Sequence, residues 1–195
     1  MLFRSDRVKV GNGLEPGNEM GPLITREHRD KVASYLDIAQ EEGATVLRDG
    51  RRQRFEGDGF FLGVSLIDKV TPKMRVYQDE IFGPVLSVVR VATYEEGLAL
   101  VNSHAYGNGT AIFTRDGGAA RRFQRDVDVG MVGINVPIPV PVSYYSFGGW
   151  RASLFGDTHM YGPDGIRFFT RTKVVTARWP DPATSKIDLG FPRNR

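Results

Sequence analysis

The residue types best suited to chemistry lie in one short segment, residues 78–84 with the sequence QDEIFGP, directly before an apolar run. The Gly-Pro pair that ends this segment favours a rigid turn, which would direct Glu80 and Phe82 outwards at the entrance to a sheet. A carboxylate there can bind the vicinal hydroxyls of a ribose, and an aromatic ring beside it can form a wall against a flat ring. The ordinary alternative is a solvated glutamate and a core phenylalanine. Phe147, in a second glycine-rich turn, has the same two interpretations, because it could line a pocket or belong to the core.

The sequence lacks the residues of a self-sufficient catalytic or metal site. It contains no cysteine, which excludes a disulfide, a thiolate zinc site, an iron–sulfur cluster and a cysteine nucleophile within this chain. The three histidines, His28, His104 and His159, lie far apart and lack ligand spacing, so no metal site is predicted. His28 and His104 fall on predicted helices, where a solvated or packed imidazole is more common than a ligand. No catalytic residue is therefore predicted in this chain.

Charge and hydropathy limit the partners that we expect. The net charge of +3 belongs to the end of the chain, because residues 171–195 alone carry +4 and residues 1–170 carry −1. A nucleic-acid groove is therefore not predicted. No apolar run approaches the length of a membrane span, and the first residues lack the apolar core of a signal peptide, so we expect no membrane association. The absence of disulfides fits a cytoplasmic protein.

The spacing of apolar and capping residues predicts an α/β fold. Thr25 can cap a helix whose apolar stripe runs to Ala39 and which ends at Gly43. Further along, strands and capped helices alternate in the pattern of parallel βαβ units, which predicts a three-layer fold around a mostly parallel sheet. The predicted strands are Val85–Ala92, Thr110–Thr114 and Val129–Asn135, and the predicted helices follow Thr93 and Asp116.

The segment Arg167–Trp179 is rich in β-branched and aromatic residues and predicts a further strand. Its apolar side chains alternate onto both faces, so such a strand would need burial on both sides. Such a strand would have to find another chain, fold back or remain exposed, and we expect residues 167–179 to mediate self-association.

Five motifs, in the expected order, resemble the aldehyde dehydrogenase superfamily. Residues 80–85 resemble its E-I-F-G-P motif. The other four are Gly21-Pro22-Leu23, Tyr106-Gly107 through Ala111-Ile112-Phe113-Thr114, Gly133-Ile134-Asn135 and Phe147-Gly148-Gly149. Together the motifs cover roughly residues 6–180, and five in order are far more specific than any one of them.

Within the superfamily, the stretch from Ile134 to Val142, followed by Tyr145–Trp150, resembles the CoA-acylating methylmalonate-semialdehyde dehydrogenase branch. Hydrolytic members usually continue after Phe-Gly-Gly into S-G-x-G-R-E, whereas here Ser153 is followed by Leu154. The resemblance implies NAD-dependent oxidative decarboxylation of methylmalonate or malonate semialdehyde, with CoA as co-substrate, to propionyl-CoA or acetyl-CoA.

The resemblance also implies roles for individual residues. Glu80 would hold the nicotinamide ribose of NAD, Phe82 would pack beside the nicotinamide, and Phe147 would line the substrate tunnel. The cysteine nucleophile and the Rossmann-type domain of such enzymes precede the matched region, so the isolated chain is predicted to be an inactive C-terminal fragment.

The domain organisation that the resemblance implies has three parts. Residues 1–165 would be a truncated catalytic domain, residues 166–180 an oligomerisation strand that makes homo-oligomers, and residues 181–195 a tail. The alternative interpretation is a non-catalytic module that assembles with full-length aldehyde dehydrogenase subunits.

Overall fold

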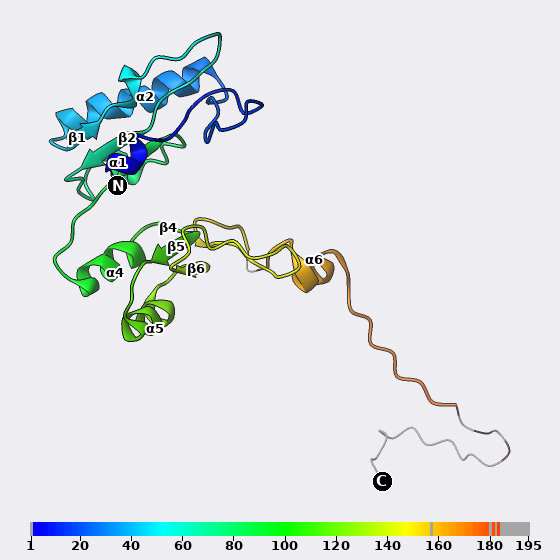
Figure 1. Cartoon of the computed structure of the whole chain (residues 1–195). Helices are drawn as coiled ribbons and strands as arrows, with labels where there is room; N and C mark the ends of the chain where they lie inside the picture. Colours follow the sequence, from blue (N-terminus) through cyan, green and yellow to red (C-terminus); the bar gives the residue numbers. More distant parts are fainter. Residues whose placement is uncertain (1, 157, 180, 182, 184–195) are drawn as a thin grey trace. The chain divides into compact units, whose positions relative to one another are not determined.

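A computed structural model describes residues 2–156, 158–179, 181 and 183 (Figure 1). The chain divides into two compact units, Met1–Glu96 and Gly97–Arg195. None of the helices described is long and apolar enough to cross a membrane.

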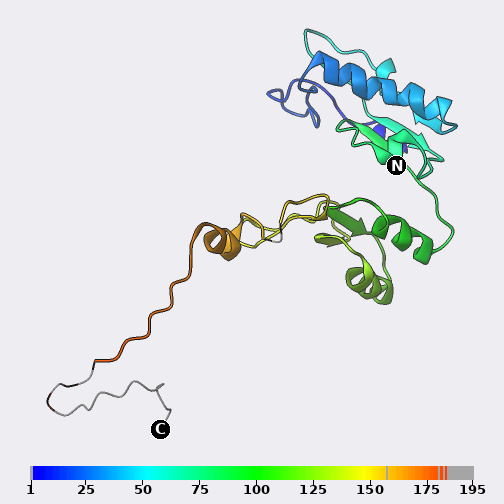
Figure 2. The ribbon, with the colours of Figure 1, turned by 180° about the vertical axis from the view of Figure 1, so that it is seen from behind.

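The first unit contains a three-stranded mixed sheet in the order β1-β2-β3. Strand β2 lies antiparallel to β1, with an irregularity between Val46 and Arg48, and parallel to β3. In both ribbon views α2 runs alongside this sheet (Figures 1 and 2). The elements of this unit are α1 (Leu2–Ser5), α2 (Arg26–Glu41), β1 (Thr45–Arg48), the 3-10 helix η1 (Gly50–Arg52), β2 (Ser65–Asp68), α3 (Arg75–Gln78) and β3 (Val85–Ser87).

Helix α2 supplies four of the buried side chains in the core of the first unit. The Thr25 hydroxyl accepts a hydrogen bond from the backbone N–H of His28 at 3.1 Å, which confirms the predicted cap. Gly43, just beyond the last turn, has a φ of +93°, a conformation that glycine adopts without strain. The apolar face of α2 packs against β2, where Ile67 is fully buried. The buried side chains of α2 are Val32, Tyr35, Leu36 and Ala39.

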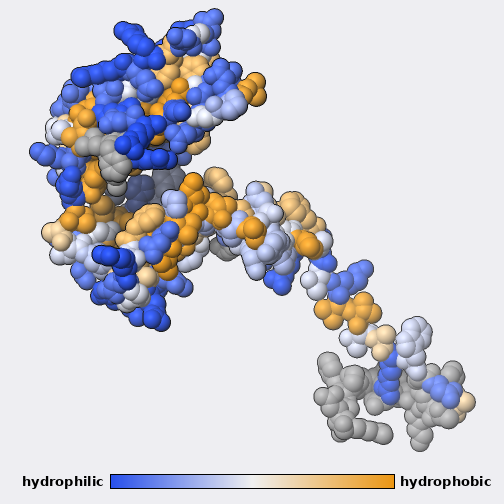
Figure 3. Space-filling view, viewed as in Figure 1, coloured by the Kyte–Doolittle hydropathy of each residue, from blue (hydrophilic) through white to orange (hydrophobic). Residues whose placement is uncertain are grey.

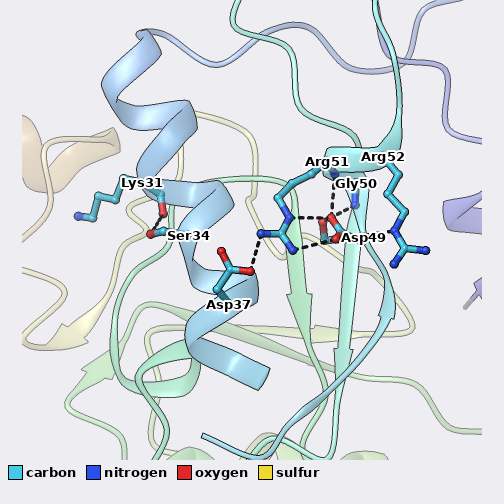
Figure 4. A network of polar contacts seen from close by, with 8 residues as sticks. Lys31, Ser34, Asp37, Asp49, Gly50, Arg51 and Arg52 are labelled. Atoms are coloured by element: carbon cyan, nitrogen blue, oxygen red, sulfur yellow. Dashed lines mark hydrogen bonds and ion pairs between the residues drawn. The ribbon is translucent and has the colours of Figure 1, made fainter. Parts of the chain in front are cut away.

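A charged network holds η1 against α2 (Figure 4). The Arg51 guanidinium donates to Asp49 at 2.8 and 2.9 Å and to Asp37 of α2 at 2.7 Å. Asp49 also accepts from the backbone N–H of Arg51, and these bonds lower the pKa of its carboxyl. The polar stretch 49–59 is therefore fixed at its start by one arginine.

The second unit contains two separate two-stranded sheets. Strands β5 and β6 are parallel, and α5 connects them, so the predicted βαβ unit is confirmed here. Asn135 follows β6 in a left-handed conformation, and its side chain exchanges two hydrogen bonds with the backbone of Thr114 at 2.9 and 3.0 Å. The elements are α4 (Tyr94–Asn102), β4 (Tyr106–Gly107), β5 (Gly109–Ile112), α5 (Gly117–Asp126), β6 (Met131–Ile134), β7 (Trp150–Arg151) and α6 (Gly162–Phe169).

The two predicted helix caps around β5 are confirmed. The Thr93 hydroxyl accepts from the N–H of Glu96 at 3.1 Å, and the Glu96 carboxylate accepts from the N–H of Ala92. Asp116 accepts from Gly118 and from a second N–H in the first turn of α5.

The predicted three layers around one mostly parallel sheet are not confirmed. The strand predicted at Val85–Ala92 extends only over Val85–Ser87 and pairs with β2 in the first unit, apart from β5 and β6. Strand β7 pairs antiparallel with β4. A continuous apolar run predicts that a strand forms, but the partner that completes its ladder comes from distant sequence.

The strand predicted at Arg167–Trp179 is wrong at its start, because residues 167–169 are the last turn of α6. Pro163 at the start of this helix and Asp164 in its first turn favour a helix N-terminus, and these signals outweigh the β-branched composition that follows. Residues 170–179 carry no helix or strand in the described structure. The predicted domain limits at 165 and 180 stay predictions, and of the tail 181–195 only Asp181 and Ala183 lie among the described residues.

Candidate cofactor-binding loop

The segment between α3 and β3 presents Glu80 and Phe82 to solvent. Glu80 is exposed, Ile81 is 9% exposed within the core, and Phe82 is 70% exposed. The alternation arises because Ile81 inserts into the core and leaves its two neighbours outside. The core interpretation of Phe82 is therefore wrong for this structure, and the outward placement predicted from the Gly-Pro turn is confirmed.

The beginning of this loop is fixed by a polar contact from α2. The Tyr35 hydroxyl donates to Asp79 Oδ2 at 2.9 Å, and the Arg75 guanidinium donates to the same oxygen at 3.2 and 3.3 Å. These two donors, Tyr35 first, hold the pKa of Asp79 below its ordinary value. The stabilisation from this carboxylate is therefore present above its ordinary pKa and is lost as the pH falls through the lowered value.

The end of the loop lies against the same face of α2. The His28 Nε2–H donates to the Phe82 carbonyl oxygen at 2.8 Å. A Cβ placed on Gly83 would lie 2.5 Å from Cγ1 of Val32, so the backbone approaches this side chain as closely as only glycine allows. Positions 28, 32 and 35 project from one side of a helix, and we call this set of three residues the α2 stripe.

Phe82 itself adopts a strained backbone conformation. Its φ is +54°, in the left-handed region that bulky side chains rarely occupy. Such strain costs about 1–3 kcal/mol and persists where the surroundings fix the conformation. The α2 stripe supplies those surroundings, and the result is an exposed aromatic ring next to an exposed carboxylate on a well-anchored loop.

Phe147 lies in the second unit, where it lines an apolar cavity of about 520 Å³. Its ring stacks on Tyr161 with a centroid distance of 4.5 Å and an interplanar angle of 13°. His159 also lines the cavity, and its Nδ1 lies 3.5 Å from the Ser146 hydroxyl. Its Nε2 is buried without a hydrogen-bond partner in the described part of the chain.

The sequence did not predict that His159 and Tyr161 lie near Phe147. The two glycines after Phe147 are a weak signal in the sequence for a close approach at this turn. In the structure, a Cβ on Gly148 would lie 2.1 Å from the His159 ring. The close approach that needs this glycine is made by a residue eleven positions further on. Among the residues described, no group of His, Asp and Glu is arranged to hold a metal ion.

Comparison with known proteins decides the family. The sequence profile described as "Aldehyde dehydrogenase family" matches residues 1–175. The chain belongs to the aldehyde dehydrogenase family. It is 57% identical over 188 residues to a malonate-semialdehyde dehydrogenase of Pseudomonas aeruginosa, an alignment that covers 95% of this chain and 38% of that protein. The chain therefore spans little more than a third of the length of this relative.

Solved structures of family members share the fold. The crystal structure of a methylmalonate-semialdehyde dehydrogenase from Oceanimonas doudoroffii superposes with a TM-score of 0.90 at 55% identity, covering 94% of this chain and 38% of that one. A protein from Sinorhizobium meliloti 1021, assigned as a methylmalonate-semialdehyde dehydrogenase and crystallised with NAD, gives a TM-score of 0.90 at 48% identity with the same coverage. The resemblance to the aldehyde dehydrogenase superfamily that residues 80–85 and the other motifs carry is confirmed, and so is the similarity to these semialdehyde dehydrogenases.

The close approach of the loop to α2 makes Gly83→Ala a direct test of how this family member anchors its loop. The added methyl group would overlap Val32, and we expect a loss of about 1–3 kcal/mol in the free energy of unfolding. Gly21→Ala is the matched control, because a Cβ on Gly21 meets nothing within 4 Å. A denaturant titration followed by the backbone amide signals of α2 measures both variants. Equal midpoints for the two would contradict the close packing of Gly83.

Proposed function

We propose that this chain is the C-terminal part of an NAD-dependent, CoA-acylating dehydrogenase that acts on malonate or methylmalonate semialdehyde. The overall reaction would consume the semialdehyde, NAD and CoA and release NADH, CO2 and acetyl-CoA or propionyl-CoA. The identity to semialdehyde dehydrogenases supports the substrate class. The observation that carries the cofactor assignment is the anchored loop with Glu80 and Phe82 exposed beside each other. We place an enzyme of this kind in the cytoplasm, which fits a chain that can form no disulfide.

The residues of the loop fit the nicotinamide half of NAD. An ionised carboxylate accepts hydrogen bonds on both oxygens, so Glu80 suits the vicinal hydroxyls of a ribose. The exposed ring of Phe82 offers a flat apolar face to the nicotinamide. NAD, when bound, supplies the hydride acceptor. Glu80 and Phe82 act by orientation, because they hold the acceptor where the substrate carbon can reach it.

Phe147 is the residue that we assign to substrate binding. Its cavity is lined mainly by apolar and aromatic side chains, which suits the carbon chain of a short semialdehyde. The sequence holds no cysteine, so the thiolate that attacks the aldehyde in this family is not supplied by these residues. We therefore propose that the chain contributes binding and orientation and does not turn over alone.

Glu80→Gln in the complete enzyme tests the cofactor assignment. A hydrogen bond to a charged acceptor is worth about 1.5–3 kcal/mol, so we expect kcat/KM for NAD to fall about tenfold to a hundredfold. Part of the loss should appear in the hydride-transfer step of single-turnover kinetics, because a loosely held ribose misplaces the nicotinamide. Glu41→Gln, an exposed carboxylate on α2, is the matched control with unchanged kinetics. Unchanged kinetics for Glu80→Gln would make Glu80 an ordinary solvated residue.

A specific observation also favours a role in assembly. The segment 166–179 exposes large apolar side chains, among them Val174 at 86% and Trp179 at 93%. The space-filling view shows apolar side chains at the surface along this part of the chain (Figure 3). Exposed apolar surface of this extent is typical of a contact with another chain. We propose that residues 167–179 join a second copy of this chain or a longer aldehyde dehydrogenase subunit.

Sedimentation of the purified chain tests this assembly role. We expect the chain to self-associate. The double variant Val174→Ser and Trp179→Ser should lower the apparent association constant by at least half, because it removes two large and strongly exposed apolar side chains from this segment. The matched control carries Leu14→Ser and Ile24→Ser, two side chains that are also strongly exposed but lie in the first unit. Identical monomeric masses for all three proteins would contradict the proposal.

A further inference from the structure

The contact between His28 and the candidate loop has features of a positioning device. His28 belongs to the first turn of α2, and it reaches a residue 54 positions away through its Nε2. A carbonyl oxygen can only accept, so Nε2 carries the proton and the imidazole tautomer is defined by this bond. The two rings also meet edge to face, with centroids 6.3 Å apart at an angle of 62°.

The hydrogen bond acts at the one residue of the loop whose backbone is strained. Phe82 has a φ of +54°, and rotation of its peptide units back to an ordinary conformation would turn its carbonyl away from His28. The same rotation would redirect the ring that is exposed on this loop. The bond from His28 therefore opposes the relaxation that would misplace Phe82.

We propose that His28 is a positioning residue for cofactor binding, which holds Phe82 in its left-handed conformation so that the ring faces the nicotinamide. The proposal rests on the function proposed above. His28 does not touch the cofactor in this account. It acts through the Phe82 carbonyl, as Val32 acts through Gly83 and Tyr35 through Asp79 in the α2 stripe.

The first measurement uses the chain itself and needs no cofactor. Backbone order parameters from 15N relaxation are about 0.85 for rigid residues and below about 0.6 for flexible ones. We expect the values for Phe82 and Gly83 to fall from the first range towards the second in His28→Ala. In His28→Gln they should stay high, because the glutamine amide places a donor close to the position of Nε2. Gln40→Ala, exposed on the same helix, is the control.

The second measurement uses the complete enzyme. We expect KM for NAD to rise about threefold to tenfold in His28→Ala, to return towards the unsubstituted value in His28→Gln, and to stay unchanged in Gln40→Ala. Alanine is a better helix former than histidine, so a merely structural role in α2 predicts no loss from His28→Ala. A difference in KM for NAD between His28→Ala and His28→Gln therefore distinguishes a positioning role from an effect on helix stability.

Two results would overturn the proposal. Unchanged order parameters in His28→Ala would show that the bond does not hold the loop, and an unchanged KM for NAD would show that the loop position does not matter to the cofactor. The proposed function fails separately, if Glu80→Gln and Phe82→Ala both leave KM for NAD unchanged. If Glu80→Gln changes KM for NAD while His28→Ala leaves it unchanged, only the role of His28 is refuted.

Discussion

The geometry of the candidate site depends on the packing of one face of α2 against residues 79–83. Val32 is fully buried and Ile81 nearly so, and burial of such a side chain is worth about 1.5–3 kcal/mol. Separation of the loop from the helix would expose apolar surface on both. The two polar contacts, Tyr35 to Asp79 and His28 to Phe82, then determine which of the possible arrangements the packed loop adopts. Burial provides the attachment, and the hydrogen bonds provide the orientation.

This division of roles explains why the unfavourable backbone conformation of Phe82 persists. Phe82 is left-handed without the freedom of a glycine, while its neighbour Gly83 occupies a place where no Cβ fits. A more relaxed loop would bring the Phe82 ring towards the core or the Gly83 backbone away from Val32. Strain at an exposed aromatic residue next to an exposed carboxylate is a feature expected of a binding loop, where orientation matters more than local stability.

The sequence predicts local features of this fold better than long-range ones. Thr25, Thr93 and Asp116 are caps that act within three residues, and all three are confirmed. The outward direction of Glu80 and Phe82 is predicted from a local turn, whereas in the structure the burial of Ile81 between them fixes it. The sequence cannot place β3 beside β2, and it cannot show which of three histidines meets the loop, because those contacts join distant residues. At residues 167–169 two local signals compete, and the helix start at Pro163 prevails over β-branched composition.

The most direct test of the account is a crystal structure of the complete enzyme with bound NAD. The account predicts that the Glu80 carboxylate lies within hydrogen-bond distance of the nicotinamide ribose hydroxyls and that the Phe82 ring packs against the nicotinamide. It also predicts a positive φ at Phe82, with its carbonyl accepting from His28. A nicotinamide bound away from both side chains, or a Phe82 with relaxed backbone and no contact to His28, would contradict it.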